Sequence, residues 1–203
     1  MYRFNRPEDL AVPPSPIFFD ARANRKIGDI QQIPLRLMWE VMTKCAKVDG
    51  ADVGAVKVHS VPLGSSQSST ASNRVLGSLF GAYHVYVTIR IGRAYWSFER
   101  YEEGILVQRS LEERAVIEKS MKEKRISGNC GIKSESLGKN DDLETVEDLI
   151  LVLKTAFNAL VHSRFDGLLN NCQHFARKIL RAMGFNWSKP YVVESELPVW
   201  YIY

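Results

Sequence analysis

Residues 168–178 have the sequence LLNNCQHFARK, in which Cys172 stands where an irregular segment gives way to a predicted helix. The free backbone N–H groups and the macrodipole at a helix N-terminus stabilise an anion, so a thiol placed there has a lowered pKa. Asn171 is a good capping and positioning residue for this helix, and the N–H of Cys172 itself would serve as one oxyanion donor. The stretch therefore predicts a nucleophilic cysteine, and the rest of the chain must supply its base.

Helices are predicted on both sides of this cysteine in the sequence. Residues 143–161 repeat apolar side chains at spacings of three and four, and Asn140, Asp141 and Asp142 offer oxygens to cap that helix. A second helix is predicted over residues 172–183, with Gly184 as its C-terminal cap. A third is predicted over residues 34–48 and ends at an Asp-Gly pair.

Alternating apolar side chains in the middle of the chain predict an antiparallel sheet. Residues 83–91 and 94–100 alternate and are rich in Val, Ile and Tyr, and Gly92-Arg93 between them supplies a hairpin turn. Further strands are predicted at residues 104–109 and 55–61. We therefore expect an α+β fold in which this antiparallel sheet packs against the C-terminal helices.

The chain of 203 residues is expected to form one domain preceded by an arm. Residues 1–35 contain Pro7, Pro13, Pro14 and Pro16, which forbid a regular helix. We expect an extended N-terminal arm there, which wraps its own domain or contacts a protein partner. Residues 36–203 are expected to form the single domain, with a flexible serine-rich loop at 63–74 and a charged insertion at 110–140.

Charge and cysteine content exclude several classes of protein. With 27 basic and 23 acidic residues the net charge is +4, which is too small to predict nucleic-acid binding. Cys45, Cys130 and Cys172 are too widely spaced for a disulfide scaffold or a CxxC zinc site, and we expect no metal. No apolar run approaches the roughly 20 residues of a transmembrane segment, and no signal peptide is visible, so we expect a cytoplasmic or nuclear protein.

A cysteine nucleophile needs a base, and the chain has four histidines: His59, His84, His162 and His174. His174 is two residues from Cys172, about 200° around a helix, and is expected to pack or to cap. The helix dipole alone favours a histidine at position 162, and His59 lies in a strand beside the serine-rich loop. His84 lies in the apolar run AYHVYV, where a buried imidazole must find a polar partner, and we predict it as the base.

A third side chain usually orients such an imidazole by accepting a hydrogen bond from its other nitrogen. The strand at 94–100 would pair with the strand that holds His84, so its alternate residues share one face. Glu99 and Ser97 are the candidates on that face. Gln108, on the following strand, is either an extra oxyanion donor or a polar residue at the edge of the sheet.

The order of a strand histidine, a polar residue on the next strand and an NC-x-HF helix start resembles the circularly permuted papain-like thiol enzymes. The lecithin:retinol acyltransferase-like family is similar in its strand histidine and its NC-x-HF motif, matched here at His84 and at residues 171–175. The PPPDE family of isopeptidases is similar in its strand histidine and its NNC-x-HF segment, matched at residues 170–175. The resemblance covers about residues 83–184, and it implies that His84 is the base and Cys172 the nucleophile.

The resemblance implies a permuted papain-like fold and a thiol-dependent hydrolase of isopeptidase or protease type. Such an enzyme acts on an amide, thioester or ester through an acyl-enzyme on Cys172 and needs no cofactor. One alternative is a lipid acyltransferase or phospholipase of the lecithin:retinol acyltransferase-like branch, so that the substrate is a protein or a lipid acyl group. The other alternative is a catalytically silent structural or binding module of the same fold in a larger assembly.

Overall fold

The elements of the structure follow one another nearly in the order that the apolar spacing predicts. The computed structural model describes residues 17–20, 25–26, 34–62, 83–101, 104–118, 132–161 and 171–187. The strands are β1 (Ile17–Asp20), β2 (Arg25–Lys26), β3 (Val53–Pro62), β4 (Tyr83–Ile91), β5 (Ala94–Tyr101), β6 (Gly104–Ser110) and β7 (Lys133–Gly138). The helices are α1 (Leu35–Asp49), α3 (Glu113–Glu118), α4 (Val146–Val161) and α5 (Cys172–Ala182).

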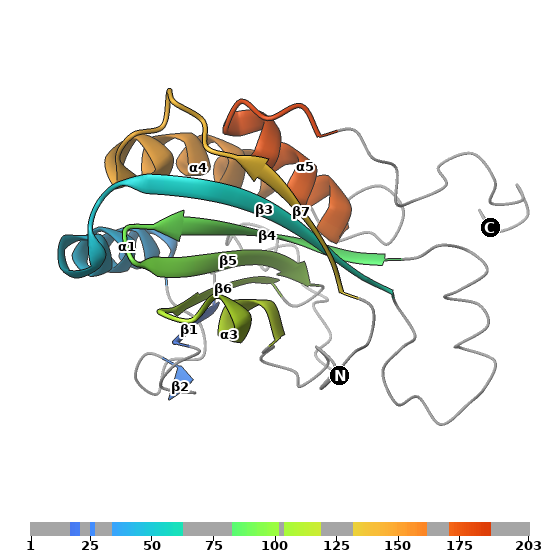
Figure 1. The fold of residues 1–203 in the computed structure, drawn as a ribbon, viewed down its shortest axis with the longest axis horizontal. Coiled ribbons are helices and arrows are strands. Elements are labelled where there is room, and N and C mark those ends of the chain that lie inside the picture. Colours follow the sequence, from blue (N-terminus) through green and yellow to red (C-terminus); the bar gives the residue numbers. More distant parts are fainter. Residues whose placement is uncertain are drawn as a thin grey trace, which may run out of the picture.

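One seven-stranded sheet forms the centre of the described fold, in the order β2-β1-β6-β5-β4-β3-β7 (Figure 1). The strands β6, β5, β4, β3 and β7 are neighbours in antiparallel pairs, and β1 joins β6 in parallel. The α+β class and the antiparallel sheet are thus confirmed. Three strands come from segments with no predicted strand, because β1 and β2 belong to the N-terminal arm and β7 to the charged insertion at 110–140.

An apolar layer lies between one face of the sheet and the helices α1, α4 and α5. Alternate residues of β4, beginning at Val85, are fully buried in it. The ring of Phe157 on α4 makes edge-to-face contacts at centroid distances of 5.1 Å with Trp39, 5.7 Å with Phe175 and 6.3 Å with Phe98. These contacts join α1, α5 and β5 to α4, and truncation of the ring to Ala would cost about 3–5 kcal/mol. The layer therefore places the start of α5 against the sheet.

The start of α4 differs from the prediction. The helix begins three residues after position 143, and the predicted cap at Asn140 and the two aspartates after it is wrong. The Oδ2 atom of Asp148 accepts from the N–H of Thr145 at 3.1 Å, and the N–H of Asp148 donates to the Thr145 hydroxyl at 3.3 Å. The Asn140 amide instead donates to the carbonyl of Met183, just after α5. A reciprocal cap of this kind satisfies two N–H groups at once, so it fixes the start of the helix.

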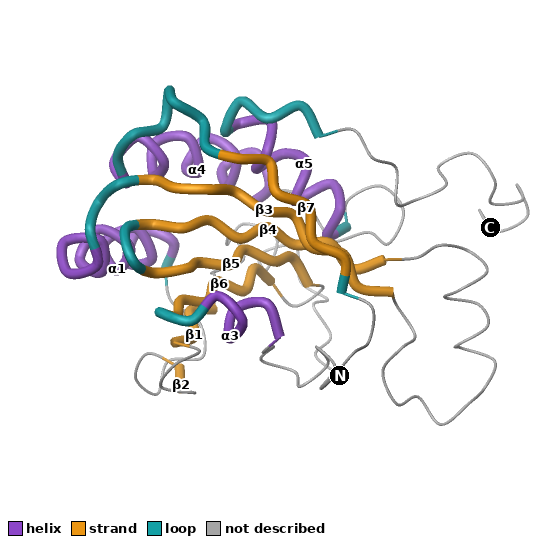
Figure 2. The backbone as a smooth tube through the Cα atoms, in the orientation of Figure 1, coloured by secondary structure: helices purple, strands orange, loops and turns teal. Residues whose placement is uncertain are grey.

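Three loops are joined by backbone hydrogen bonds at one end of the sheet, where Figure 2 shows them in teal. Gly92, in the hairpin between β4 and β5, donates to the carbonyl of Asp52, and Arg93 donates to that of Asp49, each at 2.8 Å. The carbonyl of Ala51 in turn accepts from the first residue of α4 at 2.7 Å. A Cβ atom on Gly92 would lie 2.1 Å from the Asp49 carbonyl oxygen, so only glycine fits this hairpin. These bonds fix one end of β4, and His84 lies at the other end.

The opposite face of the sheet is polar, although most of its side chains are buried. Its buried polar residues are His59, Thr88, Ser97, Glu99, Gln108 and Ser110. Helix α3 lies over this face, where its residues Ala115 and Val116 pack against Tyr95. Lys57 of β3 also forms an ion pair with Glu113 of α3 at 2.6 Å. Because buried polar atoms must find partners, this layer is where ordered side-chain networks are expected.

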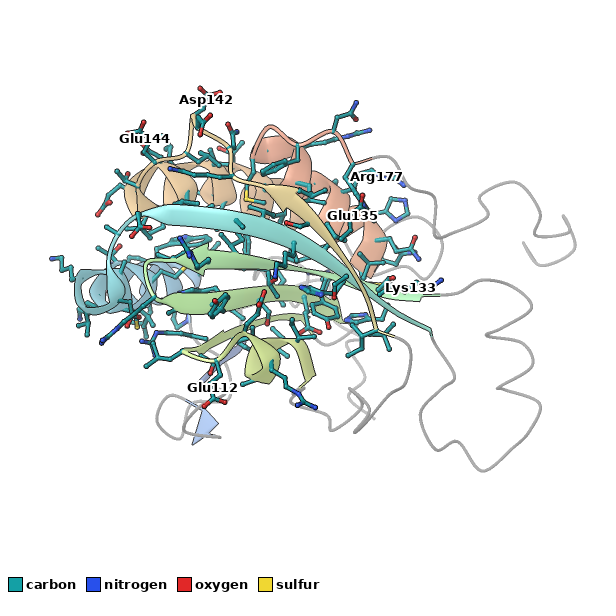
Figure 3. The ribbon with its side chains drawn as sticks, in the orientation of Figure 1. Glu112, Lys133, Glu135, Asp142, Glu144 and Arg177 are labelled. Carbon is teal, nitrogen blue, oxygen red and sulfur yellow. The ribbon has the colours of Figure 1, made fainter. Side chains whose placement is uncertain are left out.

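Six charged side chains are labelled in Figure 3. They are Glu112 before α3, Lys133 and Glu135 on β7, Asp142 and Glu144 in the loop before α4, and Arg177 on α5. Among the helices in the described ranges, none has the length and apolar content to cross a bilayer. The serine-rich loop at 63–74, Cys130, His162 and Asn170 lie outside the described residues.

Candidate active site

The start of α5 is built as the sequence predicts. Asn171 is the N-cap, and its Oδ1 accepts from the N–H groups of Gln173 at 2.9 Å and His174 at 3.3 Å. The ring of His174 completes a capping box, since its Nδ1 accepts from the N–H of Asn171 at 3.5 Å. The predicted capping role of His174 is confirmed. Cys172 consequently occupies the first turn of a helix whose entry is held by side chains.

Cys172 contacts the beginning of β4, in the stretch where β4 is no longer paired with β5. The register of β4 with β5 begins at the pair Val87 and Phe98, whereas its register with β3 extends back to the first residue of β4. In the stretch before Val87, the N–H of Val85 and the side chain of His84 both form hydrogen bonds with the Cys172 thiol. The separation of the two strands therefore lets the N-terminus of α5 approach the predicted base.

Opposing effects act on the ionisation of the thiol. Burial raises the pKa of Cys172, because only 6% of the residue is exposed. The hydrogen bond and the charge of His84, together with the N–H groups of Val85 and Gln173, lower it by more. The pKa of the Cys172 thiol therefore lies below its ordinary value, which favours the nucleophilic thiolate.

His84 is oriented by a carboxylate on the neighbouring strand. Its Nε2 lies 3.0 Å from Oε2 of Glu99, whose side chain is fully buried. Since a carboxylate only accepts hydrogen bonds, Nε2 carries the hydrogen of this contact. The other oxygen of Glu99 accepts from Nε2 of Gln108 at 3.2 Å. The order Cys172, His84, Glu99 and Gln108 thus runs across α5, β4, β5 and β6.

Ser97 and Gln108 are the other predicted members of the site, and they lie on β5 and β6 rather than in contact with the Cys172 sulfur. Ser97 stands opposite Thr88 on β4 and Gln108 on β6, and its buried Oγ has no hydrogen-bond partner in the part of the chain that the structure describes. The structure therefore brings Glu99, and not Ser97, into contact with His84. Gln108 contacts Glu99, and its role as an oxyanion donor stays a prediction.

Two residues of the polar layer, His59 and Tyr86, are not among the predicted members of the site. The ring of Tyr86 is stacked on that of His84 at a centroid distance of 5.9 Å and on that of His59 at 4.9 Å. His59 is fully buried, and its two nitrogens lie 2.8 Å from the hydroxyls of Ser134 and Thr88. The signal for Tyr86 is present in the sequence, since a residue two positions from His84 on a strand shares its face.

The remaining candidates for chemistry are structural or lie outside the described residues. Cys45 is half-buried on α1 and packs against the apolar layer, as expected for a cysteine without a catalytic role. In the ranges that the structure describes, no three side chains of His, Cys, Asp or Glu are grouped closely enough to hold a metal ion.

Comparison with known proteins finds no family model, no curated protein and no solved structure that this chain matches.

Proposed function

We propose that this protein is a thiol-dependent hydrolase of permuted papain-like fold, which acts on an amide, thioester or ester through an acyl-enzyme on Cys172. The observation that carries the proposal is the contact of three groups from three elements. They are the Cys172 thiol at the start of α5, His84 on β4 and Glu99 on β5. A thiol of lowered pKa beside an imidazole that a carboxylate orients has the parts that nucleophilic catalysis needs.

In the first step the Cys172 thiolate attacks the carbonyl carbon of the substrate. The bond between Sγ and carbon forms, the π electron pair moves to oxygen, and the N–H of Cys172 is one donor for that oxyanion. As the tetrahedral intermediate collapses, the bond to the leaving nitrogen, oxygen or sulfur breaks and His84 protonates the leaving atom. Because Nε2 of His84 is engaged by Glu99, Nδ1 is the nitrogen that exchanges this proton.

In the second step water cleaves the thioester. Nδ1 of His84 takes a proton from water, the resulting hydroxide adds to the thioester carbon, and a second tetrahedral intermediate forms. Its collapse breaks the bond between Sγ and carbon, releases a carboxylic acid and restores the thiolate with its imidazolium. The carboxylate of Glu99 keeps the ring oriented through both steps, because it holds the nitrogen that does not exchange protons.

We propose an amide substrate, with an isopeptide bond to a lysine as the first choice. The segment NNCQHF supports this choice, because it resembles the NNC-x-HF segment of the isopeptidase branch over one residue more than the NC-x-HF motif of the acyltransferase branch. A lipid ester and a silent module are the competing outcomes that the experiments below distinguish.

Trapping of the acyl-enzyme tests the chemistry without knowledge of the natural substrate. The full chain is incubated with p-nitrophenyl acetate at neutral pH, and the acetylated peptides are identified by mass spectrometry. We expect rapid acetylation of Cys172, slow acetylation of Cys45, and loss of the rapid phase in Cys172→Ala and His84→Ala. Equal acetylation of the two cysteines, unchanged in His84→Ala, would contradict the dyad and favour the silent module.

Two further substrates then separate the protein and lipid branches. One is a fluorogenic peptide whose C-terminal glycine is joined to a lysine ε-amine, and the other is a phospholipid in mixed micelles. The proposal expects cleavage of the isopeptide bond that is lost in Cys172→Ala. Release of a fatty acid from the phospholipid, with no cleavage of the peptide, would keep the mechanism but overturn the proposed substrate class.

A further inference from the structure

We infer that Tyr86 is a positioning residue of the candidate dyad, whose ring holds His84 in place and favours its protonated form beside the Cys172 thiolate. The inference rests on the proposed function. The Tyr86 ring contacts the ring of His84, and it would act on the thiol through that histidine.

The contact between Tyr86 and His84 follows from the strand. The two residues are separated by one position on β4, so their side chains lie on the same face of the sheet. Their ring centroids are 5.9 Å apart and their planes differ by 26°. This separation and this small angle are those of an offset stack, in which the π face of the tyrosine is turned toward the imidazole.

The position of the Tyr86 ring is itself fixed from two other elements. Its side chain is fully buried, and its hydroxyl donates to the carbonyl of Ile117 on α3 at 2.9 Å. Across the strand pair, the ring stacks on His59 of β3 at 4.9 Å with 22° between the planes. His59 cannot turn freely, because Ser134 and Thr88 hold its two nitrogens at 2.8 Å each. The tyrosine therefore presents a rigid surface to His84.

Such a surface has two consequences for the dyad. A stacked neighbour restricts rotation of the imidazole, so that Nδ1 stays directed at the thiol while Glu99 holds Nε2. The negative face of an aromatic ring also attracts a cation, and the imidazolium is the form of His84 that accompanies the thiolate. The ionisable groups in contact with His84 are Glu99 from β5 and Cys172 from α5, and the Tyr86 ring lies beside the same imidazole.

The pH dependence of Cys172 alkylation tests this role. The rate of carboxamidomethylation by iodoacetamide is measured for each cysteine peptide of the full chain, since only the thiolate reacts. Tyr86→Phe retains the ring and is expected to keep the profile close to that of the native chain. Tyr86→Leu is expected to move the apparent pKa of the Cys172 thiol upward by about 0.5 to 1 unit.

A variant that preserves shape separates the electrostatic role from packing. Incorporation of pentafluorophenylalanine at position 86 keeps an aromatic ring but reverses the sign of its π face. We expect the upward shift of the thiol pKa in this variant relative to Tyr86→Phe, and this comparison stands even where Tyr86→Leu fails to fold. Tyr95→Leu is the matched control, because Tyr95 lies on the same sheet face and packs against α3.

The outcomes are distinct for the inference and for the proposed function. Profiles that coincide in Tyr86→Phe and the pentafluorophenylalanine variant would overturn the role of Tyr86 in favouring the imidazolium. If the native chain already shows an ordinary thiol pKa that His84→Ala does not alter, the proposed dyad itself fails. A shift in the Tyr95→Leu control equal to that in Tyr86→Leu would assign the effect to general loosening of the polar layer.

Discussion

His84 and Glu99 are joined by a 3.0 Å contact between Nε2 and Oε2, although their strands have already separated at that point. The last register pair of β4 and β5 before the gap is Val87 and Phe98, so the side-chain bond links the strands beyond the end of their backbone ladder. The thiol of Cys172 reaches the same stretch of β4 from α5. A local departure from regular pairing thus makes room for a hydrogen-bonded line of three side chains.

The lowered pKa of Cys172 predicts that this cysteine reacts with iodoacetamide at a pH where Cys45 does not. The rate should be constant above the lowered pKa and should fall tenfold per pH unit below it, because protonation removes the nucleophile. In His84→Ala the hydrogen bond and charge of the histidine are gone, while burial and the N–H groups of Val85 and Gln173 remain, so the profile should move to higher pH than in the native chain. Peptide-resolved mass spectrometry gives both profiles. Coincident profiles for Cys172 in the native chain and the variant would exclude the contact.

Glu99→Gln is expected to slow acetylation of Cys172 by about 100-fold. The amide retains the size of the carboxylate but removes its charge, so the imidazolium loses its partner and Nε2 its fixed acceptor. Stopped-flow measurement of the p-nitrophenol burst reports the rate. Glu112→Gln is the matched control, because Glu112 is exposed and lies before α3 (Figure 3). If Glu99→Gln slowed acetylation no more than Glu112→Gln does, Glu99 would have no role in the mechanism.

Asn171→Ala is expected to destabilise the protein by about 0.5–2 kcal/mol, since it removes the cap of α5. Urea unfolding followed by circular dichroism measures the change. Asn171→Ser restores a capping oxygen and should recover most of the stability. The exposed Thr155, which bonds only to the Leu151 carbonyl of its own helix in the described structure, provides a control in Thr155→Ala. A loss in Asn171→Ala no greater than in this control would contradict the capping role.

Asp49→Ala is expected to cost about 3 kcal/mol, because it leaves the guanidinium of Arg109 without its buried carboxylate. Asp49 is almost completely buried at the end of α1, and Nε of Arg109 on β6 donates to it at 2.9 Å. The exposed pair of Arg36 and Glu40 on α1 supplies the contrast, and Arg36→Ala should change stability by less than about 0.5 kcal/mol. Thermal unfolding of both variants at equal ionic strength decides whether burial makes this difference.

The sequence predicts best the features that depend on local periodicity. The helices α4 and α5 and the hairpin of β4 and β5 appear where apolar spacing places them, and the position of Cys172 at a helix start depends only on nearby residues. The predicted start of α4 is wrong, because Asn140, Asp142 and Thr145 all have side chains that can cap a helix. Which of them caps α4 depends on tertiary contacts. The side-chain oxygen of Asn140 accepts from the N–H of Asp142 and its amide donates to the carbonyl of Met183, and Thr145 caps the helix.

Contacts across the sheet could not be predicted in the same way. Glu99 and Ser97 are equivalent in an alternating pattern, and the choice between them depends on the point at which β4 and β5 separate. The stack of Tyr86 on His59 depends on the register of β3 with β4, which pairs these two residues. The sequence of the segment that connects the two strands does not predict this register. Strand β7 has few apolar residues, so its place beside β3 is visible only in three dimensions.

Strand β7 also has a consequence for how molecules of this protein behave toward one another. It is the last strand at its end of the described sheet, and its exposed residue Lys133 places a charge along that border (Figure 3). A strand added from another molecule would have to desolvate this charge, and natural sheets use such edge lysines to prevent edge-to-edge aggregation. The charged segment that supplies β7 thus covers the free edge of β3 and keeps further strands from pairing with the sheet. It also brings Ser134 into contact with His59.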